Sequence, residues 1–229
     1  RLIVRPYSVC VLNLEDATNV CLEHLVMGHA PQKGGCESGV VGAKNVMHLS
    51  MLDCDLFGSG TEGLTLEDVR QLKFVRSTIR ECTYGIMTLR GCRDVRFQDS
   101  VFRDNEEYWG VMLHDCRDVE FSACRFAANK VAGALFDATF CSDVRAAGCE
   151  FHDNEVTTRA TGHVEFIDQV AGEDDDKPSK FALIRIRAKH QGRFAKGYEW
   201  ELDIDVANKT ATLKVRRRER QLDLSDAVL

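Results

Sequence analysis

Four polar residues recur at nearly constant spacing through the middle of the chain. Glu67, Arg90, His114 and Asp137 are separated by 23, 24 and 23 residues. If they shared one surface, the imidazole could act as a general base, a carboxyl group as the acid, and the guanidinium could neutralise the carboxylate of an acidic sugar. The alternative is a solvated row of alternating charges, in which each pair contributes only about 0.3 kcal/mol. We prefer this second interpretation.

Two aromatic residues lie in the longest repeat unit. In "DNEEYWG", residues 104–110, Tyr108 and Trp109 follow two glutamates. An aromatic pair on a loop can stack on the ring of a sugar, and it can equally form a hydrophobic plug for the turn. Both interpretations stay open.

Acidic residues close in sequence raise the question of calcium. Asp53, Asp55 and Glu62 form one group, and Asp104 with Glu106 forms another. Carboxylate oxygens suit Ca²⁺. However, the glycine–aspartate nonapeptide repeats of calcium-binding solenoids are missing, and isolated acids are common on turns. The sequence therefore predicts no metal and no cofactor, with calcium as the alternative.

The spacing of these residues reflects a repeat that runs through most of the chain. Its glycines recur 22 to 25 residues apart. They are Gly39, Gly63, Gly85, Gly110 and Gly133. Three apolar columns align with them. They read Leu22, Met51, Phe74, Phe97, Phe121 and Ala146; Met27, Leu56, Ile79, Phe102, Phe126 and Phe151; and Val20, Leu49, Leu72, Val95, Val119 and Val144.

Within each repeat, apolar and polar residues alternate over three to five positions. This alternation indicates short strands with one buried face. The repeat is too short for a strand, a helix and a return, so we predict an all-β solenoid of stacked coils. Equivalent residues of neighbouring coils would then lie roughly 4.8 Å apart.

The ten cysteines fit the interior of such a solenoid. Cys54, Ser77, Ser100, Cys124 and Cys149 form one column, and Val69, Cys92, Cys116 and Cys141 form another. Small side chains stack well inside, where a free cysteine behaves as a small hydrophobe. A zinc site is the competing interpretation, but no CxxC pair occurs. Stacked neighbours rarely meet disulfide geometry.

Asparagine and aspartate also recur in columns. Asn19, Asn45, Asp94, Asp118 and Asp143 each precede a valine, and Asn105, Asn129 and Asn154 form a second column. Both residue types tolerate left-handed backbone, so we predict that both columns lie at corners of the coil. The second column is expected to form hydrogen bonds along the solenoid axis.

The motif V-x-F-x-x-C/S-x-F-x-x-N, together with "CDLFGSGTEGLTLEDV" and "STIRECTYGIMTLRGCRDVRF", resembles bacterial right-handed β-helix repeat proteins with a pectate-lyase-like fold. The resemblance covers residues 8–157 and implies a right-handed parallel β-helix of about six coils. It brings no catalytic residue to this chain. The paired-aspartate and Gly-His-Gly segments of the pectin hydrolases are missing, and six coils are few for a catalytic cleft.

The repeat fades after Asn154, and we divide the chain into a β-helix, residues 1–160, and a C-terminal region, residues 161–229. An acidic linker is expected at 171–180. The alternating patterns beyond it predict a small three-stranded antiparallel meander. It can cap an open end of the solenoid or serve as a separate interaction module.

Composition limits the possible partners. A net charge of −6 gives no reason to expect nucleic-acid binding, and no apolar run is long enough to span a membrane. The chain begins at Arg1, as a processed product does, so a signal or another domain can precede it. Ten thiols favour a reducing compartment. Because inward ladders would protect them from oxidation, the balance is towards export or the cell surface.

The sequence thus favours a non-catalytic solenoid whose flat sheet face binds a polysaccharide or a protein partner. One alternative is a lyase or glycoside hydrolase acting on an acidic glycan. Another is a structural spacer in a larger assembly. The oligomeric state stays open.

Overall fold

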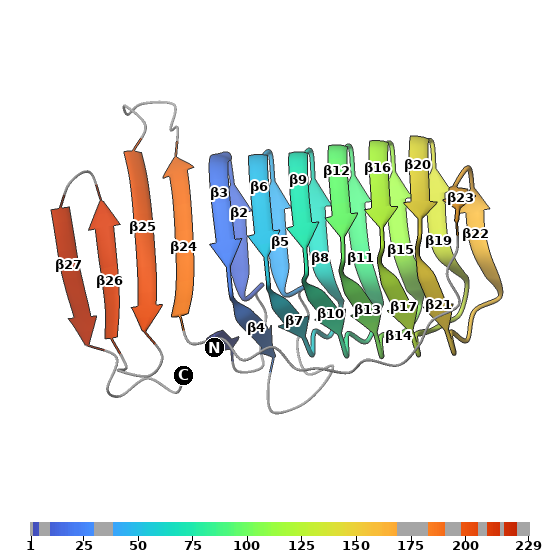
Figure 1. The fold of residues 1–229 in the computed structure, drawn as a ribbon, viewed down its shortest axis with the longest axis horizontal. Coiled ribbons are helices and arrows are strands. Elements are labelled where there is room, and N and C mark those ends of the chain that lie inside the picture. Colours follow the sequence, from blue (N-terminus) through green and yellow to red (C-terminus); the bar gives the residue numbers. More distant parts are fainter. Residues whose placement is uncertain are drawn as a thin grey trace.

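The computed structural model describes residues 10–29 and 39–168 in full, and the backbone of five further strands, within 2–4, 183–190, 198–205, 210–215 and 218–223. The described part is an all-β solenoid in which successive coils stack along one axis (Figure 1). Each complete coil contributes one strand to each of three parallel sheets, here called A, B and C. The predicted fold class is confirmed.

Sheet A has the shortest strands. In spatial order they are β1 (Leu2–Val4), β4 (Val26–His29), β7 (Asp55–Phe57), β10 (Thr78–Arg80), β13 (Val101–Arg103), β17 (Arg125–Ala127) and β21 (Glu150–His152).

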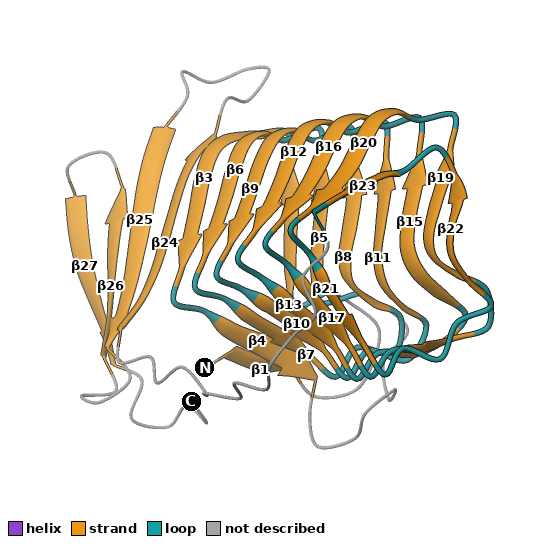
Figure 2. Cartoon of the chain, turned by 45° about the vertical axis from the view of Figure 1, so that its right-hand side comes forward, coloured by secondary structure: helices purple, strands orange, loops and turns teal. Residues whose placement is uncertain are grey.

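Sheet B forms a second wall of the solenoid, visible in Figure 2. Its strands are β2 (Leu12–Glu15), β5 (Val41–Lys44), β8 (Glu62–Glu67), β11 (Gly85–Arg90), β15 (Trp109–His114), β19 (Ala134–Thr139) and β22 (Thr158–Gly162).

Sheet C is the longest. Its parallel strands are β23 (Glu165–Ile167), β20 (Ser142–Ala147), β16 (Arg117–Ser122), β12 (Arg93–Gln98), β9 (Arg70–Val75), β6 (Met47–Leu52) and β3 (Ala17–Glu23). It continues as β24 (Leu183–His190), β25 (Tyr198–Asp205), β26 (Thr210–Val215) and β27 (Arg218–Asp223). A small pair, β14 (Glu106–Glu107) and β18 (Lys130–Val131), lies apart.

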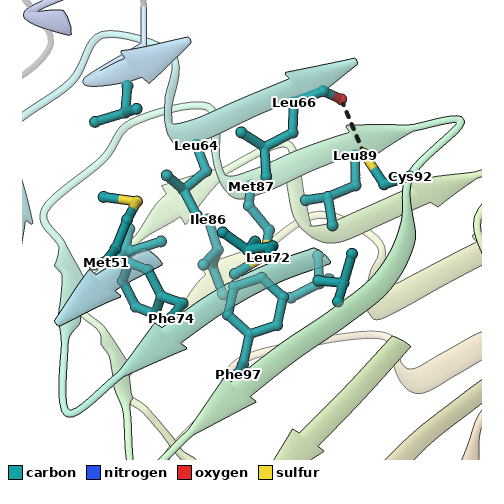
Figure 3. Packing of buried hydrophobic residues seen from close by; sticks show 14 of the residues in the cluster. Met51, Leu64, Leu66, Leu72, Phe74, Ile86, Met87, Leu89, Cys92 and Phe97 are labelled. Atoms are coloured by element: carbon teal, nitrogen blue, oxygen red, sulfur yellow. Dashed lines mark hydrogen bonds between the residues drawn. The ribbon is translucent and has the colours of Figure 1, made fainter. Parts of the chain in front are cut away.

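The three predicted apolar columns are in register on neighbouring strands. The rings of Phe97 and Phe121 stack with centroids 4.6 Å apart and planes only 5° from parallel. Figure 3 shows Met51, Phe74 and Phe97 side by side on successive coils. Identical positions therefore repeat their packing from coil to coil, as the sequence columns predicted.

The predicted cysteine columns also lie in the core. The Cys54 amide donates a hydrogen bond to Ser77 Oγ over 2.9 Å, and the Cys116 amide lies 3.4 Å from Cys141 Sγ. The Cys92 thiol donates to the Leu66 carbonyl at 3.7 Å (Figure 3). All the described cysteines are free thiols. Burial raises the pKa of the Cys54 thiol to about 12, which keeps it protonated.

The corners use left-handed backbone. Asn19, Asp94, Asp118 and Asp143 have φ between 54° and 57°, as predicted for their column. Asn45 also has positive φ, at 52°, but it belongs to the preceding corner. The Asn45 amide donates a hydrogen bond to the Glu67 carbonyl. One coil later, the Asp68 amide donates the equivalent hydrogen bond to the Arg90 carbonyl. The valine that follows Asn45 had suggested the wrong column.

The second polar column forms a buried ladder. Asn129 Nδ2 donates to Asn154 Oδ1 over 2.8 Å and to the Phe102 carbonyl over 2.9 Å. Asn105 repeats the pattern one coil earlier, donating from Nδ2 to Asn129 Oδ1 over 3.0 Å. The predicted axial hydrogen bonds are therefore present, and they provide partners for backbone groups at a turn that is shielded from water.

The C-terminal region contains four antiparallel strands where three were expected, because β27 follows β26. Strand β24 pairs antiparallel with β3 and so continues sheet C beyond the first coil. At the other end, β23 pairs with β20, which extends the solenoid to Ile167, past the boundary expected at 160. The expected linker at 171–180 lies outside the described residues.

Candidate functional site

The outer face of sheet B carries the polar residues that the sequence singled out. Early in its strands, two consecutive residues point into the core: Ile86 with Met87, and Leu135 with Phe136, all no more than 1% exposed. Successive side chains of a strand normally point to opposite faces. Two consecutive inward residues therefore change which positions of the strand face outward. This change leaves the first residues of the strands, such as Glu62, on the outer face.

The predicted polar row is formed in part. Glu67, Arg90 and His114 are aligned on neighbouring strands. The fourth position is Thr139, and Asp137 pairs instead with Met112, one row away. The expected position of Asp137 was wrong because Gly133 does not align with Gly110. The coil is two residues longer there, and a shift of two residues preserves the outward direction but changes the row.

The same row extends further than the sequence indicated. Lys44 and then Glu15 continue it on the other side of Glu67. Lys44 Nζ lies 2.8 Å from Glu67 Oε1, and this hydrogen bond and charge raise the pKa of Lys44. Lys44 precedes Glu67 by 23 residues, the spacing that separates Glu67 from Arg90, so the sequence columns could have revealed it.

Between this row and the first residues of the strands lies a groove of about 390 Å³. The groove is open because the middle row of outward positions is occupied by the small residues Gly42 and Thr65. The lining comprises Cys10, Asn13, Glu15, Gly39, Gly42, Ala43, Lys44, Thr61, Glu62, Thr65 and Glu67. These side chains offer hydrogen-bond donors and acceptors beside apolar surface, a composition suited to a hydroxylated ligand.

Glu62 is the least expected residue of the groove. It is only 7% exposed, and its Oε1 accepts a hydrogen bond from Thr65 Oγ1 over 3.0 Å. Burial raises the pKa of its carboxyl group, against the opposing effect of neighbouring threonine hydroxyls. One of these, Thr88, is 6% exposed and its hydroxyl makes no hydrogen bond of ordinary geometry. The sequence had suggested Glu62 only as a calcium ligand.

The predicted aromatic pair belongs to a cluster of three. The ring of Tyr84 lies 4.9 Å from that of Tyr108 and 6.0 Å from that of Trp109. Tyr84 and Tyr108 are 40% and 54% exposed. The indole lies over Gly85, where a Cβ atom would come within 2.4 Å of it. Sequence reasoning missed Tyr84, although an aromatic residue precedes both Gly85 and Gly110. Gly85 pairs with Trp109, which puts Tyr84 next to Tyr108.

The acidic residues considered for calcium have other partners. Asp53 pairs with Arg76 at 2.7 Å, and Asp55 pairs with Arg80 at 2.9 Å. Within residues 10–29 and 39–168, no group of three or more His, Cys, Asp or Glu side chains is placed to hold a metal ion.

Comparison with known proteins agrees with this architecture. The family model described as "Right handed beta helix region" matches residues 35–169, more than half of the chain. The chain belongs to the right-handed β-helix family. The match covers the coils that carry the aromatic cluster and the groove residues from Gly39 onward. This β-helix has no match among curated proteins.

Among solved structures, the β-helix is similar to "Geobacillus virus E2 - ORF18", with 10% identity and a TM-score of 0.26 over 96% of this chain and 67% of that one. A likeness this low carries no argument. In the part of the chain that the structure describes, no helix is long and apolar enough to cross a membrane.

Proposed function

We propose that this β-helix is a non-catalytic binding protein whose outer sheet B face holds an extended polysaccharide. The observation that carries the proposal is the groove of about 390 Å³ on that face, with an exposed aromatic cluster where two strands of the same sheet begin. A sugar presents an apolar ring face to aromatic side chains and hydroxyl groups to polar ones. The sheet B face offers both kinds of contact.

The repeat supports a polymer more than a single sugar. Equivalent outward residues recur on each coil, roughly 4.8 Å apart along a straight axis. A chain of similar sugars laid along that axis would meet similar contacts at each step. The groove lies at β2, β5 and β8, whereas the aromatic cluster lies at β11 and β15, so both can contact one chain.

The test is the affinity of the full chain for a panel of neutral and acidic polysaccharides. Tyr108→Ala is expected to weaken binding about 10-fold, because it removes one stacking ring. Tyr108→Phe retains the ring and is expected to bind as the wild type does. If no polysaccharide binds, the proposal fails, and a protein partner or a spacer role becomes the better account.

A second candidate is cleavage of an acidic glycan, favoured by one specific observation. Glu62 is a buried carboxyl group with a raised pKa, in a groove that also contains Glu15 and Glu67. A general acid needs a raised pKa of this kind. The test is release of new chain ends from the polysaccharides that bind. Turnover that disappears in Glu62→Gln would support cleavage, and binding without turnover would exclude it for those substrates.

A further inference from the structure

Several arginines on the outside of the described solenoid have an acidic partner. Arg76 pairs with Asp53 at 2.7 Å and Arg145 with Glu165 at 3.2 Å. Arg96 contacts both carboxylate oxygens of Asp118, at 3.0 and 2.9 Å. Such pairing is the usual arrangement for charged side chains on the outside of a parallel solenoid, because like charges in register repel.

Three arginines without such a partner lie together at the corner where sheet B meets sheet C. Arg90 ends β11, and Arg70 and Arg117 begin β9 and β16. Among the described residues, none of these three guanidinium groups has a hydrogen bond or an ion pair. Arg93, between Arg70 and Arg117, has only a long contact of 3.8 Å with Asp115.

The arginines of sheet C are in register. Arg93 pairs with Arg70 on one side and with Arg117 on the other, and all three side chains reach solvent. We call Arg70, Arg93 and Arg117 the arginine ladder. It is bounded by the uncharged Met47 and Ser142 on the adjacent coils. Like charges directly opposite one another destabilise a sheet, so this arrangement needs compensation.

The acidic residues of this corner provide little compensation. Asp68 Oδ1 lies against the backbone of Gly91, where a Cβ atom would come within 2.5 Å of it. Asp94 and Asp118, which follow two ladder arginines, lie 3.3 and 2.9 Å from Arg96. The ladder is therefore left with guanidinium groups that can each bind a carboxylate or sulfate through two hydrogen bonds.

We propose that the arginine ladder, with Arg90 across the corner, binds an acidic polysaccharide carrying a carboxylate or sulfate on successive sugars. The rungs are roughly 4.8 Å apart in a straight line. This spacing is close to the repeat of one sugar in an extended chain, so charges on consecutive sugars can meet consecutive arginines. The site does not depend on the groove, because it lies beyond the corner and acts through charge.

A nucleic acid is the less suitable polyanion. The phosphate backbone of a duplex winds away from a straight row. An acidic polysaccharide can stay extended along the three rungs.

The experiment is electrophoresis of the full chain through gels containing alginate, dextran sulfate, neutral dextran or duplex DNA. The variant R70Q/R93Q/R117Q is expected to bind the two acidic polysaccharides about 10-fold less tightly or weaker still, with a smaller dependence on salt. Arg76→Gln is the matched control, since it removes an exposed arginine directly after β9 that has a partner. It is expected to bind normally.

Three results would overturn the proposal. The triple variant binds alginate and dextran sulfate as tightly as the wild type does; Arg76→Gln loses as much affinity as the triple variant; or duplex DNA binds as tightly as the acidic polysaccharides. If the triple variant is unfolded, Arg70→Gln and Arg117→Gln are measured singly, and each is expected to show part of the loss. Salt dependence separates this site from the groove. Tyr108→Ala removes a ring and no charge, so it should leave the salt dependence of binding unchanged, whereas the triple variant should reduce it.

Discussion

The interior of the solenoid and the outer face of sheet B follow opposite rules. Inside, neighbouring coils match each other: Phe97 lies on Phe121, and Asn105 bonds Asn129. Outside, neighbouring coils differ: Glu62, Gly85 and Trp109 occupy one row. Residues that repeat from coil to coil give buried groups their packing and hydrogen-bond partners. Residues that differ between coils form the groove, the exposed rings and the unpaired charges.

The largest expected effect on stability comes from removing a ring of the buried aromatic stack. Phe121→Ala is expected to lower the free energy of unfolding by about 4 kcal/mol, because Phe121 is fully buried between the rings of neighbouring coils. Phe140→Ala is the control: its side chain is 81% exposed, so a change within about 1 kcal/mol is expected. Chemical denaturation measures both. Equal losses would contradict the distinction between inside and outside.

Thiol reactivity tests whether the core excludes water and charge. With the pKa of Cys54 raised from 9.0 to about 12, the thiolate fraction at neutral pH falls about a thousandfold. Alkylation of the native chain, followed by mass spectrometry, should therefore modify Cys54 far more slowly than the half-buried Cys10. Comparable alkylation rates at Cys54 and Cys10 would show that the buried cysteine column is open to solvent.

The asparagine ladder should be nearly as costly to break as the aromatic stack. Asn129→Ala removes two donated hydrogen bonds and leaves Asn105 and the Phe102 carbonyl without their buried partners. We expect a loss of about 3 kcal/mol in the free energy of unfolding. Asn13→Ala, on the exposed outer face, is the matched substitution and should change stability by less than about 0.5 kcal/mol. A small effect of Asn129→Ala would mean that water replaces the ladder.

The smallest expected effect concerns Glu62 and the pH dependence of stability. Because burial raises its pKa above the ordinary 4.5, the folded chain holds this proton more tightly than the unfolded chain does. That stabilisation is complete at acid pH and is lost as the pH rises from about 4.5 through the raised folded value.

Glu62→Gln should therefore be more stable than the wild type near neutral pH, by on the order of 1 kcal/mol, and should lose this part of the pH dependence. Thermal unfolding across a pH series measures both effects. Parallel curves for the two proteins would show that the Glu62 carboxyl group is solvated like an ordinary one.

The sequence predicted the interior well because each coil imposes the same requirements on its neighbours. Phe74, Phe97 and Phe121 occupy equivalent positions, so spacing alone assigns them to one column. Asn105, Asn129 and Asn154 were placed at a corner for the same reason. The family match and the strand register agree with those assignments.

The outer face was less predictable because its residues are not constrained by repetition. Asp137 was placed in the wrong row, since two additional residues in its coil shift the strand while leaving the pattern of alternation intact. The burial of Glu62 depends on a local irregularity that period-two alternation does not reveal. Tyr84 was available from its position before Gly85, but no equivalent aromatic residue precedes Gly63 or Gly133 to mark a column.

The most direct test of polysaccharide binding at sheet B is hydroxyl-radical footprinting of the full chain, with and without a saturating polysaccharide. We expect oxidation of Tyr84 and Tyr108 to fall sharply, because the polymer would cover their exposed rings. His152, on sheet A, should be oxidised equally in both samples. Undiminished labelling of both tyrosines in the presence of a bound polymer, or equal protection of His152, would contradict the assignment of the binding face.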